Sequence, residues 1–224
     1  MEITINSRGV ERVRSGHLWV YRSDVKEPRG VPGGSVVRVI DERRRFIAQA
    51  LYSDRSEISL RVLTQHEEAI NRDWWRRRIN QAADRRKRLE HDTSAYRVIF
   101  SEGDLLPSLI VDRYADILVV QTLSQGTDVI KSELVDLLVE KFEPRAVVER
   151  NDVRVRAYEG LTQQTGLLYG HAPDELEVVQ HGVRFIVSPL SGQKTGSFLD
   201  QRENHRAAAS TSSRRRACPR LLYL

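Results

Sequence analysis

Four short runs rich in β-branched and aromatic residues fill the first 63 residues, and their close spacing constrains the fold more than any other feature. These runs are residues 18–21, 35–40, 46–52 and 58–63. Turn-forming residues separate them, at positions 28–30, 32–34, 41–42 and 53–54. Short strands with such punctuation are typical of small closed or nearly closed β-barrels. We therefore predict a barrel over residues 1–66, with Trp19 in its core because it alternates with Leu18 and Val20.

The hydrophobic period changes to that of a helix over residues 67–91. Five apolar residues share one stripe of this predicted helix: Trp75, Ile79, Ala82, Ala83 and Leu89. Basic residues occupy its other faces: Arg76, Arg77, Arg78, Arg85, Arg86, Lys87 and Arg88. Such a basic linker helix is expected to follow a phosphate backbone, to dock its apolar stripe on the next domain, or to do both.

Residues 92–190 alternate between strand-like and helix-like segments, which predicts a central α+β domain. Strands are expected at 98–100, 108–112, 117–121, 146–149 and 184–187, from their β-branched residues. A helix is expected between them, with Thr127 as its N-cap and Pro144 beyond its end.

Composition excludes several classes of protein. The chain has 224 residues, of which 40% are hydrophobic and 30% charged, and no apolar run reaches membrane-spanning length. We expect a soluble cytoplasmic protein without a membrane partner. Cys218 is the only cysteine and the six histidines lack ligand spacing, so neither a disulfide nor a metal site is expected.

Charge is distributed unevenly along a chain whose net charge is +5. Basic residues outnumber acidic ones in residues 1–66, 71–91 and 202–224, whereas acidic residues dominate 92–201. A basic N-terminal part suits a polyanion held through its phosphates, which makes nucleic acid the expected partner. A solvated charged helix would explain the excess of basic residues at 71–91 but not the excess at 1–66.

The stretch at residues 192–204 reads Gly-Gln-Lys-Thr-Gly-Ser-Phe-Leu-Asp-Gln-Arg-Glu-Asn. Glycines allow backbone to approach a ligand closely, and the polar residues that follow can orient it. A surface turn that leads into a polar helix is the simpler alternative. The stretch resembles the GQKTGFFLDQRxNR signature of the ribosomal RNA large-subunit methyltransferase I family, with Ser197 in place of one of the paired aromatic residues and His205 or Arg206 at the terminal arginine.

Three further stretches are similar to the same family. Residues 16–22 and 33–39 resemble its N-terminal PUA domain, a pseudo-barrel that holds structured RNA, and residues 103–114 resemble a hairpin of its central domain. The resemblance implies enzymes that methylate carbon 5 of cytosine in ribosomal RNA with S-adenosylmethionine (SAM).

The resemblance also implies two sets of site residues. The residues expected to line the methyl-donor or target-base pocket are Lys194, Thr195, Phe198, Asp200, Gln201 and Arg202. Those expected to contact RNA are Arg12, Arg14, His17, Arg22, Arg76 and Arg77.

This chemistry needs a thiolate that adds to the ring and a doubly wound sheet that holds the donor. After Asn204 the chain has no room for that sheet, and Cys218 has no context typical of a nucleophile. No catalytic residue is therefore expected, the Rossmann-type domain is expected to be missing or interrupted, and SAM is not expected to bind the chain well.

The codons of residues 217–224, read one nucleotide forward, permit Leu-Val-Leu-Asp-Cys-Phe-Thr, which resembles the family's first donor-binding strand. We therefore expect residues 191–224 to begin a truncated methyltransferase domain, with residues 209–224 altered by a frameshift. The expected function is RNA binding as the N-terminal part of a methyltransferase that is inactive alone. A stand-alone RNA-binding protein with a basic tail is the alternative, and an enzyme acting on small molecules is a third. The sequence leaves homodimer formation open.

Overall fold

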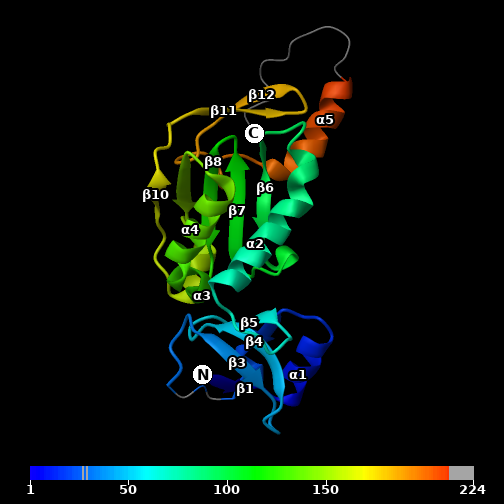
Figure 1. Ribbon diagram of the computed structural model, residues 1–224, viewed down its shortest axis with the longest axis vertical. Coiled ribbons are helices and arrows are strands. Elements are labelled where there is room, and N and C mark those ends of the chain that lie inside the picture. The colour runs from blue at the N-terminus through cyan, green and yellow to red at the C-terminus, as the bar shows by residue number, and fades with distance from the viewer. Residues whose placement is uncertain (27, 29, 212–224) are drawn as a thin grey trace.

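The computed structural model describes residues 1–26, 28 and 30–211, which form three β-sheets and helices of an α+β protein. A five-stranded N-terminal sheet, a five-stranded central sheet and a two-stranded hairpin follow one another along the chain (Figure 1). Cys218 and the segment read in a shifted frame, residues 217–224, lie outside the described residues.

The N-terminal sheet has the strand order β1-β3-β4-β5-β2. Its strands are β1 (Glu2–Thr4), β2 (Trp19–Tyr21), β3 (Val36–Ile40), β4 (Phe46–Tyr52) and β5 (Ile58–Thr64). Each of the four predicted runs therefore forms a strand. Ile3, Val20, Val37, Val39 and Leu60 lie in one buried apolar cluster inside this curled sheet.

Helix α1 (Ser7–Arg14) interrupts the strands and was not predicted. The Asn6 side chain caps it by accepting a hydrogen bond from the Gly9 amide at 2.9 Å. Val13, on the inner face of this helix, is fully buried, whereas most other residues of the helix are polar. The helix spans only eight residues, about two turns, which is shorter than the window in which a helical period is recognised, so this region was wrongly interpreted as strands and turns alone.

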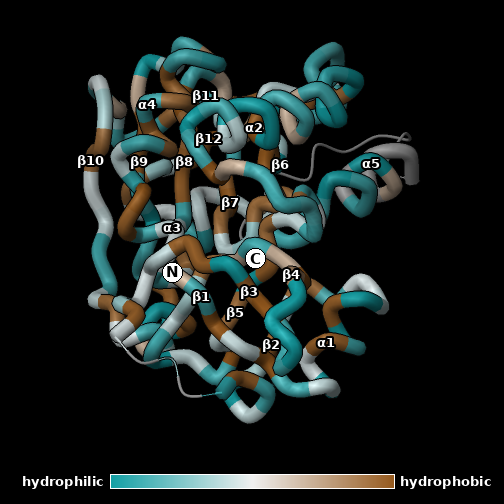
Figure 2. Tube along the Cα trace, turned by 60° about the horizontal axis from the view of Figure 1, so that its bottom comes forward, coloured by the Kyte–Doolittle hydropathy of each residue, from teal (hydrophilic) through white to brown (hydrophobic). Residues whose placement is uncertain are grey.

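The central sheet has the order β10-β9-β8-β7-β6. Its strands are β6 (Ala95–Phe100), β7 (Leu109–Tyr114), β8 (Ile117–Thr122), β9 (Ala146–Arg150) and β10 (Thr165–Gly170). All neighbours pair antiparallel except β8 and β9, which are parallel and are joined through α3 (Gln125–Val129) and α4 (Lys131–Phe142). In Figure 2 the hydrophobic colour follows strands of this sheet as well as strands of the N-terminal sheet, so each sheet has an apolar core of its own.

Helices α2 (Arg72–Arg86) and α4 cover one face of the central sheet (Figure 1). Trp74, Trp75 and Ile79 from α2 share one buried cluster with Leu134 and Leu138 from α4. The linker helix therefore docks its apolar stripe on the next domain. It is shorter than predicted, because Asn71 caps its start and a 3-10 turn, η2 (Lys87–Leu89), follows it.

The N-cap expected at Thr127 is in fact Ser124. Ser124 and Thr127 form a reciprocal capping box, in which Thr127 occupies the third helical position. Both residue types suit a cap, and the sequence alone did not separate them. The end of α4 before Pro144 is as predicted, with Glu143 in a left-handed conformation.

The opposite face of the central sheet is covered by the hairpin of β11 (Leu176–Gln180) and β12 (Val183–Val187) and by the segment that follows it. Val178 and Val187 of the hairpin and Leu199 pack against Tyr114 and Val148 of the sheet. The described chain then continues through η5 (Leu199–Gln201) into α5 (Arg202–Thr211). The segment predicted to form the pocket is thus held against the sheet.

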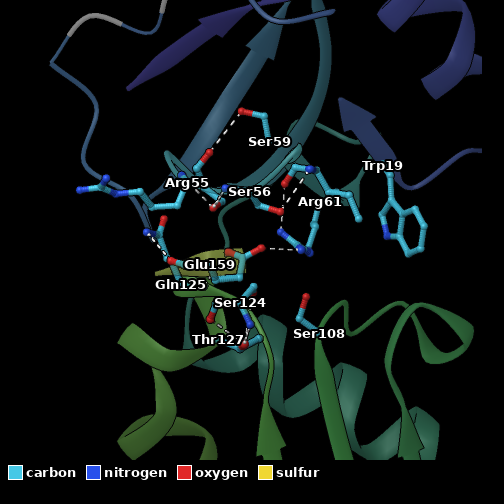
Figure 3. Close-up of polar contacts among 12 residues, drawn as sticks. Trp19, Arg55, Ser56, Ser59, Arg61, Ser108, Ser124, Gln125, Thr127 and Glu159 are labelled. Carbon is cyan, nitrogen blue, oxygen red and sulfur yellow. Dashed lines mark hydrogen bonds and ion pairs between the residues drawn. The ribbon is translucent and has the colours of Figure 1, made fainter. Parts of the chain in front are cut away.

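Buried contacts join the barrel to the central domain (Figure 3). Arg61 of β5 donates to Glu159 at 2.7 Å, with side-chain exposures of 7% and 1%. Glu159 ends η4 (Arg154–Glu159), a 3-10 helix after β9. A side chain at Gly126 in α3 would overlap Leu51 of the barrel, since its Cβ would lie 2.8 Å from that leucine. The two sheets therefore meet in a closely fitted junction.

Within the described part of the chain, no helix has the length and apolar character required to span a membrane.

Candidate functional site

The segment around Lys194 and Thr195 is fastened to strand β7 by a buried polar network. The Thr195 hydroxyl donates to Asp112 Oδ2 at 2.6 Å, and Arg97 donates to both oxygens of that carboxylate at 2.8 and 3.0 Å. Asp112 and Thr195 are both buried. The buried carboxylate therefore holds a strand and the loop together, with its charge compensated by Arg97.

Tyr114 adds a second attachment two residues further along β7. Its hydroxyl lies 3.1 Å from Thr195 Oγ1 and accepts a hydrogen bond from the Ser197 amide at 3.0 Å. Burial raises the pKa of the Tyr114 phenol above its usual range, and the nearby Asp112 charge adds to the rise. The phenol thus remains a neutral hydrogen-bonding group at pH 7.

The two glycines of the segment are needed for its close packing. A Cβ on Gly192 would lie 2.7 Å from the carbonyl oxygens of Ser188 and Gly196. Gly196 has a φ of +142° and lies against the Tyr114 ring. Larger residues at either position would displace the loop from the sheet.

A cavity of about 440 Å³ lies between this loop and strand β6. Three residues predicted for the donor pocket line it, namely Lys194, Asp200 and Arg202. Lys194 Nζ lies 4.1 Å from the centre of the Phe198 ring and 3.5 Å from Asp200 Oδ2. The loop therefore presents an ammonium group to the cavity, and η5 and α5 present a carboxylate and a guanidinium group.

The other three predicted residues lie beside the cavity but are not part of its lining. Thr195 is turned to Asp112, Phe198 lies under the Lys194 ammonium, and the Gln201 side chain accepts a hydrogen bond from Asn204 at 2.6 Å. The six residues thus lie in one continuous segment that runs from the loop through η5 to the start of α5, but only three of them line the cavity. Their assignment to a donor pocket stays a prediction.

Strand β6 supplies cavity residues that the sequence interpretation missed. Tyr96, Arg97 and Phe100 line the cavity, and the Phe100 ring is largely exposed. The Arg97 guanidinium lies 5.5 Å from the centre of that ring. A charged residue inside an otherwise apolar strand, followed by an aromatic residue at its end, was the available signal.

Arg202 and His181 meet at Asp92 on the rim of this region. Arg202 donates to both Asp92 oxygens at 2.8 and 3.1 Å, and His181 Nδ1 lies 3.0 Å from Asp92 Oδ2. These contacts tie the start of α5 to the hairpin turn. Arg202 is therefore held in place before any ligand is considered.

The RNA contacts predicted for the barrel begin at α1. Arg12 places its guanidinium 4.9 Å from the centre of the Tyr21 ring and 3.7 Å from Asp24. Arg14 and His17 are exposed on the same helix and on the turn that follows it. A hollow of about 280 Å³ is lined by Arg12, His17, Leu18, Trp19, Tyr21 and Glu102, with Gly16.

Trp19 is not in the barrel core, contrary to the prediction. Its side chain is 39% exposed, and the indole nitrogen donates to Glu102 Oε1 of the central domain at 2.9 Å. Strand alternation does place Val20 inside, but β2 is an edge strand, so its outward face meets a loop 83 residues away in sequence. Trp19 therefore presents an aromatic face beside the junction.

Asp104 anchors the loop that carries Phe100 and Glu102. It is buried and accepts hydrogen bonds from Arg85 at 2.8 Å and from the Phe100 amide at 2.6 Å. Burial opposes its ionisation, but hydrogen bonds from Arg86 and from the Phe100 amide outweigh that effect and lower the pKa of Asp104. Two arginines of the basic helix therefore hold this loop rather than project freely.

The remaining predicted RNA contacts lie apart from α1. Arg22 donates to the carbonyls of Asp54 and Ser56, both at 2.9 Å. Arg76 pairs with Glu140 of α4 at 2.9 Å, and Arg77 pairs with Glu68 at 3.3 Å. The six predicted residues therefore do not form a single patch. Among residues 1–26, 28 and 30–211, no group of three or more acidic, histidine or cysteine side chains could hold a metal ion.

Comparison with known proteins identifies relatives of both parts. The model of the PUA-like domain family matches residues 3–65. The protein named ribosomal RNA large subunit methyltransferase I from Tolumonas auensis is 36% identical over 206 residues, which cover 89% of this chain and 52% of that protein. Its namesake from Shewanella amazonensis is 41% identical over 197 residues, which cover 86% of this chain and 50% of that protein.

Solved structures share the fold. A protein of Streptococcus mutans described as a SAM-dependent methyltransferase superposes with a TM-score of 0.79 at 20% identity, covering 95% of this chain and 55% of its own. A methyltransferase complexed with SAH superposes with a TM-score of 0.76 at 20% identity, covering 91% of this chain and 52% of its own. This chain spans about half the length of the curated relatives it matches. Over that shared half, the chain is 36–41% identical to proteins of the ribosomal RNA large subunit methyltransferase I family and resembles them.

Proposed function

We propose that this chain binds ribosomal RNA as the N-terminal part of a cytoplasmic, SAM-dependent cytosine-C5 methyltransferase and does not transfer methyl groups alone. In this proposal residues 1–66 hold RNA, residues 67–91 link the barrel to the central domain at 92–190, and residues from 191 onward begin the methyltransferase domain. The names of the curated relatives support the substrate class.

One observation carries the proposal. Arg12, His17 and Trp19 line one hollow together with Glu102, and Phe100 lines the cavity, so a row of basic and aromatic side chains extends from α1 across the junction. Glu102 connects its two halves, since it accepts the Trp19 indole and lies two residues from Phe100. Exposed rings that alternate with guanidinium groups bind unpaired nucleotides through stacking and phosphate contacts.

The row leads to the cavity, which is also lined by Lys194 of the loop and by Arg202 of α5. We propose that this cavity receives part of the target nucleotide or of the donor when the donor-binding domain is present. In the central domain of the described residues, β8 and β9 are the only strands that pair in parallel. These residues therefore hold no doubly wound parallel sheet. SAM chemistry would therefore be supplied by a domain beyond them, while Lys194 and Arg202 orient the bound group.

Replacing Trp19 by alanine tests the proposal. Loss of one base–aromatic stack is worth about 1–3 kcal/mol, so affinity for a structured ribosomal RNA fragment should fall by about 5- to 150-fold. Fluorescence anisotropy measures this at low salt, with Trp19→Phe retaining most of the affinity. Ile186→Ala, an exposed apolar residue on the hairpin, is the control and should bind like the wild type.

Two results would contradict the proposal. One is a wild-type chain that does not bind structured ribosomal RNA even at low salt, where phosphate contacts are strongest. The other is methyl transfer from SAM to RNA by the purified 224-residue chain, which would disprove its inactivity. Deletion of residues 205–224 distinguishes the proposal from the alternative. A stand-alone RNA-binding protein that uses this tail as a basic arm should lose much of its RNA affinity when the tail is removed.

A further inference from the structure

A second basic and aromatic surface lies at the domain junction, away from the row at Trp19. It is centred on η4, where Tyr158 is 73% exposed and Val155 is 41% exposed. Arg154, at the start of the same helix, is exposed and forms no ion pair with the other described residues. So large an exposed ring adds little to the stability of the core, and Val155 and Arg154 on the same short helix are apolar and cationic.

The burial pattern of η4 explains why this face points outward. Arg156 is buried and donates to the Thr122 carbonyl and to Asp128, while Glu159 is buried and accepts Arg61. In a 3-10 helix residues three apart share a face. Arg156 and Glu159 thus form the inner face, and Val155 and Tyr158 form the outer one.

The barrel contributes a cation to the same surface. The stem of Arg55, in the turn between β4 and β5, packs on Gly160, where a Cβ would lie 3.2 Å from Arg55 Cγ. The Arg55 side chain is 70% exposed, and its nearest carboxylate, Asp54, lies 3.8 Å away and already accepts Gln125 at 2.8 Å. Figure 3 shows Arg55 extending from the junction on the side opposite Trp19.

We propose that Arg55, Arg154, Val155 and Tyr158, the η4 surface, form a second RNA contact that stacks an unpaired base on Tyr158 and holds phosphates with the two arginines. This inference rests on the proposed RNA-binding function. Because the surface draws on both domains and Arg61–Glu159 fixes them together, its spacing from Trp19 is constant. An RNA that touches both sites must pass around the junction, so the pair of sites favours a folded RNA over a short single strand.

The double variant Arg154→Ala/Tyr158→Ala tests the proposal by anisotropy with a structured ribosomal RNA fragment. We expect affinity to fall by about tenfold or more, and the slope of log affinity against log salt to decrease by about one, since one phosphate contact is lost. Arg154→Ala/Tyr158→Phe should recover the stacking part of the loss. Tyr169→Ala/Arg184→Ala, which removes an exposed ring and an exposed arginine elsewhere, should bind like the wild type.

The outcomes separate this inference from the proposed function. If the wild type does not bind the RNA, the proposed function fails. If Trp19→Ala weakens binding while the η4 double variant matches the wild type, only the η4 surface is rejected. Light scattering during gel filtration tests whether the η4 surface binds a second copy of the chain instead. If the double variant changes the mass of the RNA-free protein and leaves RNA affinity intact, the surface joins two copies and the inference is wrong.

Discussion

Replacing Arg61 by methionine is expected to lower the free energy of unfolding by about 3–5 kcal/mol, because it leaves Glu159 as an uncompensated buried charge. The two side chains are 2.7 Å apart and almost fully buried between the barrel and the central domain. Urea unfolding followed by tryptophan fluorescence measures the change, since Trp19, Trp74 and Trp75 lie in both parts of the structure.

A paired substitution separates the charge effect from lost packing. In Arg61→Met/Glu159→Gln the buried charge is gone. The new glutamine oxygen can still accept the hydrogen bond that the Gln125 backbone N–H donates to Glu159 in the wild type, at 3.2 Å. Most of the lost stability should return. If the single variant unfolds at the same urea concentration as the wild type, the buried pair does not join the domains in solution.

Replacing Asp112 by alanine should cost about 3 kcal/mol, because Arg97 then lacks its carboxylate and Thr195 lacks its acceptor. The loop that holds Lys194 and Thr195 should also loosen, since one of its two attachments to β7 is lost. Trypsin cleavage after Lys194, an exposed residue of that loop, should therefore become faster than in the wild type. Urea unfolding and a digestion time course measure the two effects.

Asp116→Ala is the matched control for this second substitution. Asp116 lies at the end of the same hairpin and pairs with Arg145 at 3.1 Å, but both side chains are largely exposed. Its loss should cost about 0–1 kcal/mol and leave the cleavage rate unchanged. Equal effects of the two substitutions would show that Asp112 does not hold the loop.

The sequence predicted the strands better than the surroundings of their side chains. Runs of β-branched residues located β3, β4, β5, β7 and β8 to within two residues, because such side chains suit a pleated, half-buried surface. The exposure of Trp19 was not predictable in the same way. It depends on Glu102, and alternation within one strand carries no information about a loop that distant.

The candidate site shows the same division. The glycines and polar residues of 192–204 indicated a loop with a special backbone, and Gly192 and Gly196 do pack too closely for other residues. The sequence did not reveal which side chains face the cavity. Thr195 turns inward only because Asp112 and Tyr114 lie beneath it on β7, about 80 positions earlier in the chain.

The buried pair at the junction also fixes an order of assembly. Arg61 and Glu159 are 98 positions apart. During synthesis the barrel leaves the ribosome well before η4, and until then the Arg61 guanidinium stays hydrated. Docking of the two halves is therefore a late event of folding, and only then does Trp19 of the barrel reach Glu102 of the central domain.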